Sequence, residues 1–121
     1  MVDGCVIREL PDGGRQFALE QPELEAIRVD DRVTLKFGPT ELAIAGPFTV
    51  RTGEERHACD PRTPGGLGPL LARYPGSVRW LWTEADGALH LVFADGARLA
   101  VPALSGATTW SVGAGRPGGA A

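Results

Sequence analysis

The feature that most restricts the fold of this chain is the alternation of apolar and polar side chains in short runs. In one run, the apolar residues Val33, Leu35 and Phe37 alternate with the polar residues Thr34 and Lys36. A period of two residues is that of a β-strand with one buried face. We therefore expect Leu35 and Phe37 to lie in a core, and Thr34 to face away from it.

A second such run, with Leu89, Leu91 and Phe93, is flanked by the turn signals Asp86-Gly87 and Asp95-Gly96. Asp-Gly pairs favour tight hairpin turns. We expect residues 52–66, which are polar and rich in proline and glycine, to form a loop, and residues 23–28 stay open between a short strand and a loop. The same criteria predict strands within residues 5–10, 15–19, 32–37, 42–44, 48–51, 78–83, 89–93 and 99–101, with a last candidate at 108–112.

One short helix is expected in the middle of the chain. Leu67, Leu70, Leu71 and Tyr74 follow the spacing of an amphipathic helix, and Pro75-Gly76 ends it. A helix of two turns is not stable alone, so it must pack against the sheet.

Residues 31–37 can be placed over residues 87–93, with Leu35 on Leu91, and residues 42–44 then fall on residues 99–101. Two interpretations stay open: an internal pseudo-repeat, or the likeness that any two alternating hairpins share. The predicted fold class is mainly β (α+β). About seven or eight strands form two antiparallel β-meanders with this candidate pseudo-repeat, joined by one short helix.

The length of 121 residues fits one domain. We expect residues 1–112 to form a single β-rich domain and residues 113–121 to be a flexible tail rich in glycine and proline. The chain shows no signal-peptide pattern at its start and no apolar run long enough to span a bilayer. These features predict a soluble protein of the cytoplasm that does not bind membranes.

The net charge of −3 argues against a nucleic-acid-binding protein, which usually carries a basic stripe. Eleven of the twelve basic residues are arginine, but they are scattered along the sequence, and we interpret the excess as codon bias. The two cysteines, Cys5 and Cys59, are compatible with free thiols, although a single disulfide stays open.

No catalytic, metal or cofactor site is predicted. His57, Cys59 and Asp60 lie together but lack the paired spacing of a zinc site and any oxyanion hole. The acidic pairs Asp30 with Asp31 and Glu84 with Asp86 are interpreted as turn residues.

The three tryptophans, Trp80, Trp82 and Trp110, are the candidate partner contacts, because tryptophan is frequent at binding hot spots. Trp80 and Trp82 are expected on one strand face together with Val78, and Leu81 on the other. We favour a core position for Trp80, whereas for Trp82 core and contact stay equally open.

The runs 27–37, 42–48, 67–71 and 86–102 resemble a small bacterial family catalogued as domain of unknown function 6188, over about residues 24–112. Members of that family carry a Tyr-Glu-Ala-Trp-like segment, of which residues 107–110 of this chain keep only Trp110. The resemblance implies no activity.

We expect a non-enzymatic protein-interaction module that contacts a partner protein or forms a homodimer, of the accessory or immunity type. The alternative is a small-molecule-binding domain or minor enzyme that uses a pocket between the two sheets.

Overall fold

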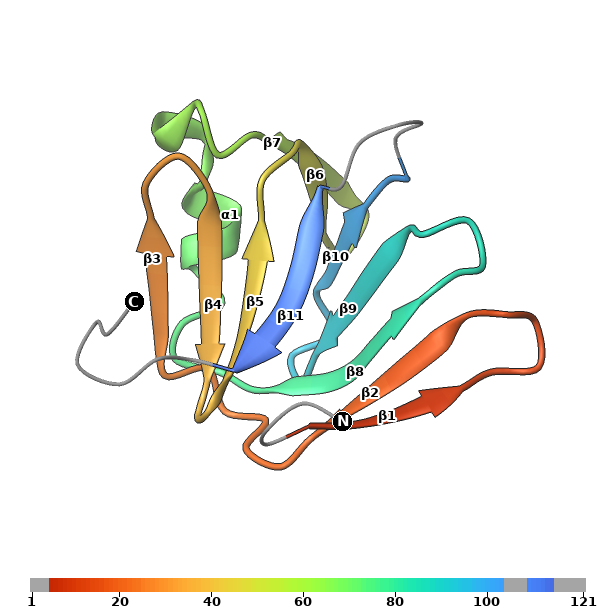
Figure 1. The fold of residues 1–121 in the computed structure, drawn as a ribbon. Coiled ribbons are helices and arrows are strands. Elements are labelled where there is room, and N and C mark those ends of the chain that lie inside the picture. The colour runs from red at the N-terminus through yellow and green to blue at the C-terminus, as the bar shows by residue number, and fades with distance from the viewer. Residues whose placement is uncertain (1–4, 104–108, 115–121) are drawn as a thin grey trace.

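The computed structural model describes residues 5–103 and 109–114, in which eleven short strands build two antiparallel sheets (Figure 1). In this part of the chain no helix has the length and apolarity needed to cross a membrane. The elements are β1 (Cys5–Glu9), β2 (Arg15–Leu19), β3 (Ala26–Val29), β4 (Val33–Phe37), β5 (Thr40–Ile44), β6 (Phe48–Thr52), β7 (Glu55–Cys59), a 3-10 turn (Pro64–Gly66), α1 (Gly68–Leu71), β8 (Val78–Thr83), β9 (Leu89–Phe93), β10 (Arg98–Val101) and β11 (Trp110–Ala114).

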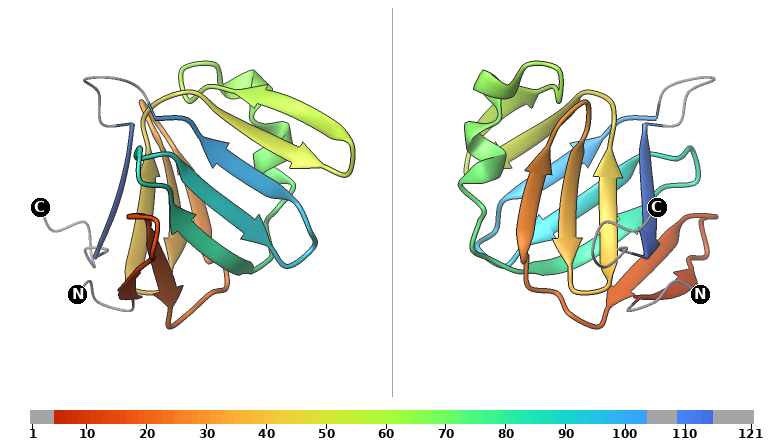
Figure 2. Two further views of the ribbon diagram at one scale, coloured as in Figure 1. Left: turned by 90° about the vertical axis from the view of Figure 1, so that its right-hand side faces the viewer. Right: turned by 60° about the vertical axis from the view of Figure 1, so that its left-hand side comes forward.

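The larger sheet has seven strands in the order β1-β2-β8-β9-β10-β6-β7, and the smaller has four in the order β11-β5-β4-β3. Figure 2 shows the two sheets as separate layers. The N-terminal hairpin joins the larger sheet, where β2 pairs with β8 through Arg15 opposite Thr83 and Gln16 opposite Trp82. The predicted mainly β fold with one short helix is therefore confirmed.

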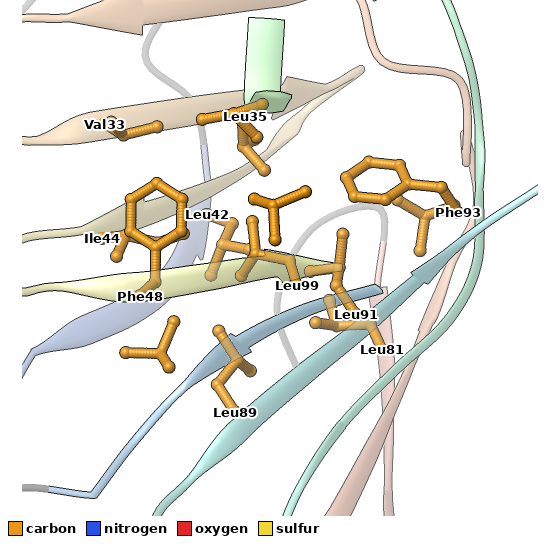
Figure 3. Packing of buried hydrophobic residues seen from close by; sticks show 14 of the residues in the cluster. Val33, Leu35, Leu42, Ile44, Phe48, Leu81, Leu89, Leu91, Phe93 and Leu99 are labelled. Carbon is orange, nitrogen blue, oxygen red and sulfur yellow. The ribbon is translucent and has the colours of Figure 1, made fainter. Parts of the chain in front are cut away.

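The core lies between the sheets and consists of the alternate apolar residues of their facing sides (Figure 3). Leu35, Phe37, Leu91 and Phe93 are at most 2% exposed, as the alternation predicts. Thr34 faces away from this core, as expected, because its neighbours Val33 and Leu35 face it, but Thr34 is buried as well. Thr34 lies on the other side of the central strand β4, between Arg28 of β3 and Ala43 of β5.

The two meanders of the suggested repeat are β3-β4-β5 and β8-β9-β10, and their registers agree. Leu35 pairs with Leu42 in the first, and Leu91 pairs with Leu99 in the second. Leu35 and Leu91 occupy equivalent places in the repeat, as do Leu42 and Leu99. The internal likeness seen in the sequence therefore extends to equivalent strand pairing.

Each meander pairs at its last strand with a strand that follows the other meander in the sequence. β6 follows β5 but pairs with β10, where Val50 lies opposite Leu99. β11 comes after β10 but pairs with β5, where Val112 lies opposite Leu42. The exchanged strands have similar sequences, Phe-Thr-Val from residue 48 and Trp-Ser-Val from residue 110. This exchange joins the two sheets into one unit.

Helix α1 is one turn long and lies at the β3 end of the two layers (Figure 2). Leu67 and Leu70 are fully buried, whereas Leu71 is 45% and Tyr74 50% exposed, so only half of the predicted apolar stripe reaches the core. Arg73 holds the end of the helix through an ion pair with Asp95 and a hydrogen bond from Nε to the Pro69 carbonyl.

Two boundaries differ from the sequence prediction. Residues 52–66 are not all loop, because Glu55–Cys59 pairs with β6 around the turn at Gly53 and extends the larger sheet. The open segment 23–28 contributes strand β3. Strand β11 continues to Ala114, two residues beyond the expected end of the domain at 112, and the rest of the expected tail, 115–121, lies outside the described residues.

Candidate functional site

A β-bulge in β8 decides which side chains of that strand face outward. Val78 pairs with Phe93 but Trp80 pairs with Val92, so Arg79 is an extra residue on β8. Val78 and Leu81 are consequently both buried, although a strict alternation would place them on opposite faces.

Trp80 and Trp82 lie together on the outer face of the larger sheet, opposite the buried Leu81. Trp80 is 51% exposed, so the expectation that it lies in the core is wrong. The sequence prediction that Trp80 and Trp82 share a face opposite Leu81 is confirmed, but its inclusion of Val78 on their face is wrong because the alternation shifts at Arg79. An extra residue in a strand reverses the faces of everything before it.

Trp82 is part of a packed group of side chains. Its ring stacks on the imidazole of His90, opposite it on β9, with the ring centroids 5.1 Å apart and an angle of 18° between the planes. The Nε2 atom of His90 lies 3.0 Å from Oε2 of Glu84. The stack and this contact fix the position of Trp82 on the sheet surface.

Three arginines form a row across three neighbouring strands of the same face. Arg98 of β10 lies opposite Arg51 of β6, which lies opposite Arg56 of β7. All three are exposed, and none forms an ion pair within the part of the chain that the structure describes. Directly opposed like charges destabilise a sheet, so the row is costly for the isolated protein. We call Arg51, Arg56 and Arg98 the arginine row.

The arginine row and the tryptophan–histidine stack line one hollow of about 240 Å³, whose further lining includes Thr49 and Ala100. A second hollow, of about 410 Å³, shares Thr49, Arg56, His90 and Ala100 with the first. Its far end carries the acidic residues Glu84 and Asp86. The two hollows therefore form a continuous depression that runs from a basic end to an acidic end.

Trp110, the third candidate partner contact, makes contacts within the protein itself. Its indole N–H donates a hydrogen bond of 2.8 Å to the carbonyl of Gly87, and its ring meets Phe17 edge to face at 6.3 Å. Trp110 lies on β11 of the smaller sheet, whereas Gly87 and Phe17 belong to the hairpins of the larger one. It joins the two sheets and is separate from the face that carries Trp80 and Trp82.

The group His57, Cys59 and Asp60 has no arrangement suited to catalysis. The Cys59 thiol is buried, its Sγ lies 3.6 Å from the Gly66 carbonyl oxygen, and burial raises its pKa, which disfavours the nucleophilic thiolate. His57 points to Thr52, with Nε2 3.4 Å from Oγ1. Across the described ranges, no three candidate ligands come together to hold a metal ion.

The two cysteines lie at opposite edges of the larger sheet, Cys5 on β1 and Cys59 on β7, and both are free thiols. A disulfide between them, which the sequence left open, is therefore not formed. Burial raises the pKa of the Cys5 thiol as well.

The acidic pairs act as turn residues. Oδ1 of Asp30 accepts a hydrogen bond from the Arg32 backbone N–H, and Oδ1 of Asp86 accepts one from Ala88. The bond from Arg32 is the main reason why the pKa of Asp30 is lowered, with a smaller contribution from a hydrogen bond with Asp31. This geometry is that of an Asx turn.

The model of a family of unknown function, DUF6188, matches residues 16–120. The chain belongs to this family. The match extends beyond the segment on which the sequence resemblance rested, and covers β2 except its first residue and every later strand of the DUF6188 domain. Neither a curated protein nor a solved structure matches the chain.

The arginine row of this DUF6188 protein was not predicted, because its three arginines are scattered along the sequence. Arg51 and Arg56 flank Gly53 at hairpin spacing, so recognising β7 would have placed them opposite each other. Arg98 is 42 positions further along, and only the pairing of β10 with β6 brings it beside Arg51. No local signal indicates that pairing.

Proposed function

We propose that this chain is a non-enzymatic protein-interaction module, which binds a partner protein through the outer face of its seven-stranded sheet. The observation that supports the proposal is Trp80, half exposed on that face beside Trp82. Tryptophan and arginine are the residue types most enriched at energetically important interface positions, and both types occur together here.

The charges on this face favour a different protein over a second copy as the partner. A symmetric dimer brings the same patch of both copies together. Of the residues that line the two hollows, only Glu84 and Asp86 are acidic, and Glu84 already contacts His90. A second copy would add three more arginines without enough carboxylates to balance them.

A small-molecule-binding role in a pocket between the sheets was the alternative from the sequence. Buried side chains such as Leu35, Leu91 and Leu99 occupy the space between the sheets (Figure 3). Trp82 lines a hollow with the outward-facing arginines, and Trp80 lines another between β2 and β8. These observations favour a surface contact over an enclosed ligand.

An accessory or immunity-type role in the bacterial cytoplasm is the biological setting we propose for this module. The buried free thiols of Cys5 and Cys59 support a reducing compartment. Under this proposal the partner is encoded next to the gene for this chain.

The test is co-purification of the chain with the products of its neighbouring genes, followed by light scattering of the purified chain alone. We expect one neighbouring product to bind, the variant Trp80→Ala to lose that binding, and the chain alone to be monomeric. The control Tyr74→Ala removes an equally exposed aromatic ring that lines a separate hollow beside β3 and should bind normally. A stable homodimer that Trp80→Ala dissociates, or equal binding by both variants, would contradict the proposal.

A further inference from the structure

We propose that the arginine row is an oxyanion-binding site that receives carboxylate side chains from an acidic segment of the partner protein. This inference rests on the proposed function and specifies the chemistry of the partner. It starts from Arg51, Arg56 and Arg98, which lie opposite one another on three neighbouring strands.

The first argument is the charge balance of the row. Side chains directly opposite each other in an antiparallel sheet have Cβ atoms about 4.5–5.5 Å apart, so both contacts of the row join like charges at close range. Of the two acidic residues that line the hollows, Glu84 contacts His90 and Asp86 accepts a hydrogen bond in its own turn, and neither pairs with an arginine of the row. Among the described residues the row therefore lacks counter-charges, and an external anion would supply them.

The second argument is the geometry of the guanidinium groups. Arginine presents a planar fork of donors that matches a carboxylate or a phosphate in two parallel hydrogen bonds. Nε of Arg51, the middle residue of the row, donates to the carbonyl of Gly53 at 3.3 Å, which restricts the motion of this side chain. A guanidinium group that is already restricted loses less conformational entropy when an anion binds to it.

The third argument is the position of the row beside aromatic surface. The hollow that contains the arginines is closed on its other side by Trp82, stacked on His90. A segment with carboxylates over the arginines can place apolar side chains against Trp82 and, one strand position along, Trp80. This mixture of an aromatic anchor and a charged neighbour fits an acidic, partly apolar protein segment better than a free inorganic ion.

The acidic end of the depression favours the same ligand over a nucleic acid. Glu84 and Asp86 line the second hollow but not the first, which holds all three arginines. A continuous phosphate backbone that followed the depression would pass these carboxylates and be repelled by them. A protein segment with its carboxylates confined to one end meets no such repulsion.

The experiment titrates the full chain, labelled with ¹⁵N, with a hexaglutamate peptide, with inorganic phosphate and with a single-stranded hexanucleotide. We expect the peptide to shift the Nε–Hε signals of Arg51, Arg56 and Arg98. Its affinity should fall several-fold as salt rises from about 0.05 to about 0.3 M, because the contact is electrostatic and exposed. The double variant R51Q/R98Q should bind about tenfold more weakly, as expected for the loss of two charged contacts.

The matched control is Arg8→Gln, because Arg8 is an exposed arginine of β1 at the far edge of the same sheet. This variant should retain full affinity for the peptide. Thermal unfolding supplies a second readout: R51Q/R98Q should melt no lower than the unaltered chain, since it removes opposed like charges.

Four results would overturn the inference: no peptide binding, equal weakening by Arg8→Gln, phosphate binding as tightly as the peptide, or tighter binding of the hexanucleotide. The titration is independent of the partner search. If the partner binds through Trp80 while the peptide fails, the oxyanion site is wrong and the interaction module stands. If the peptide binds while no partner depends on Trp80, the reverse holds.

Discussion

The indole N–H of Trp110 donates a 2.8 Å hydrogen bond to the carbonyl oxygen of Gly87. Trp110 begins β11 of the four-stranded sheet, and Gly87 lies in the turn between β8 and β9 of the seven-stranded sheet. The bond therefore connects the two sheets. On one side it starts from β11, which follows β10 in the sequence but pairs with β5 of the smaller sheet.

We predict that Trp110→Phe destabilises the chain by about 1–2 kcal/mol, because the Gly87 carbonyl loses its donor while most of the ring contact with Phe17 remains. Urea denaturation of both proteins measures this difference. Trp82→Phe is the control: the change keeps an aromatic ring to stack on His90 and should cost under about 0.5 kcal/mol. Equal losses in the two variants would show that the hydrogen bond to Gly87 contributes nothing.

The helix offers a matched pair of leucines. Leu70 is fully buried and Leu71, its neighbour on α1, is 45% exposed. Leu70→Ala should cost about 2–5 kcal/mol because it leaves a cavity in the core. Leu71→Ala should cost under about 1 kcal/mol, since little apolar surface is buried there. Denaturant melts in which Leu71→Ala is the more damaging change would mean that the helix packs through its other side.

The same substitution, threonine to valine, should change the free energy of unfolding in opposite directions at two buried positions. The hydroxyl of Thr34 is buried and has no hydrogen-bond partner, so Thr34→Val should stabilise the chain by about 1 kcal/mol. The hydroxyl of Thr83 accepts a hydrogen bond of 3.1 Å from the Arg15 N–H, so Thr83→Val should destabilise it by about 1 kcal/mol. Calorimetric melting of the two variants checks this, and a loss of stability in Thr34→Val would refute the account of Thr34.

The buried thiols predict how stability depends on alkaline pH. Burial raises the pKa of Cys5 and of Cys59 above the ordinary value of 9.0, so the unfolded chain loses these protons first as pH rises. Their contribution is present below pH 9 and is lost as pH increases through the folded pKa values. The double variant Cys5→Ala, Cys59→Ala should therefore show a shallower decline of unfolding free energy above pH 9. An unchanged slope would exclude the thiols as its cause.

The same thiols should differ in their access to a thiol reagent. Cys5 lies on β1, in a hairpin that the larger sheet holds through two residue pairs between β2 and β8. Cys59 contacts Gly66 and is covered by the chain that leads into α1. Because weakly held segments open more often than the rest, Cys5 should react faster in the native protein. Single-cysteine variants distinguish the two rates, and faster labelling of Cys59 would contradict this order.

The core faces of most strands and the positions of the hairpin turns could be predicted from the sequence. Leu35, Phe37 and Leu91 follow a period of two because alternate side chains of a strand point to opposite faces, and this rule acts within a few residues. Gly87 and Gly96 adopt φ angles of 98° and 94° in Asp-Gly turns, again a local preference.

The candidate site depends on contacts between distant parts of the chain. The bulge at Arg79, which separates the buried Val78 from the face of Trp80, is set by pairing with β9. The row that joins Arg98 to Arg51 exists only because β6 crosses to the other meander. Local periodicity determines which face of a strand is apolar. The choice of neighbouring strand depends on the packing of the whole domain, and only that choice brought the arginines and tryptophans onto one surface.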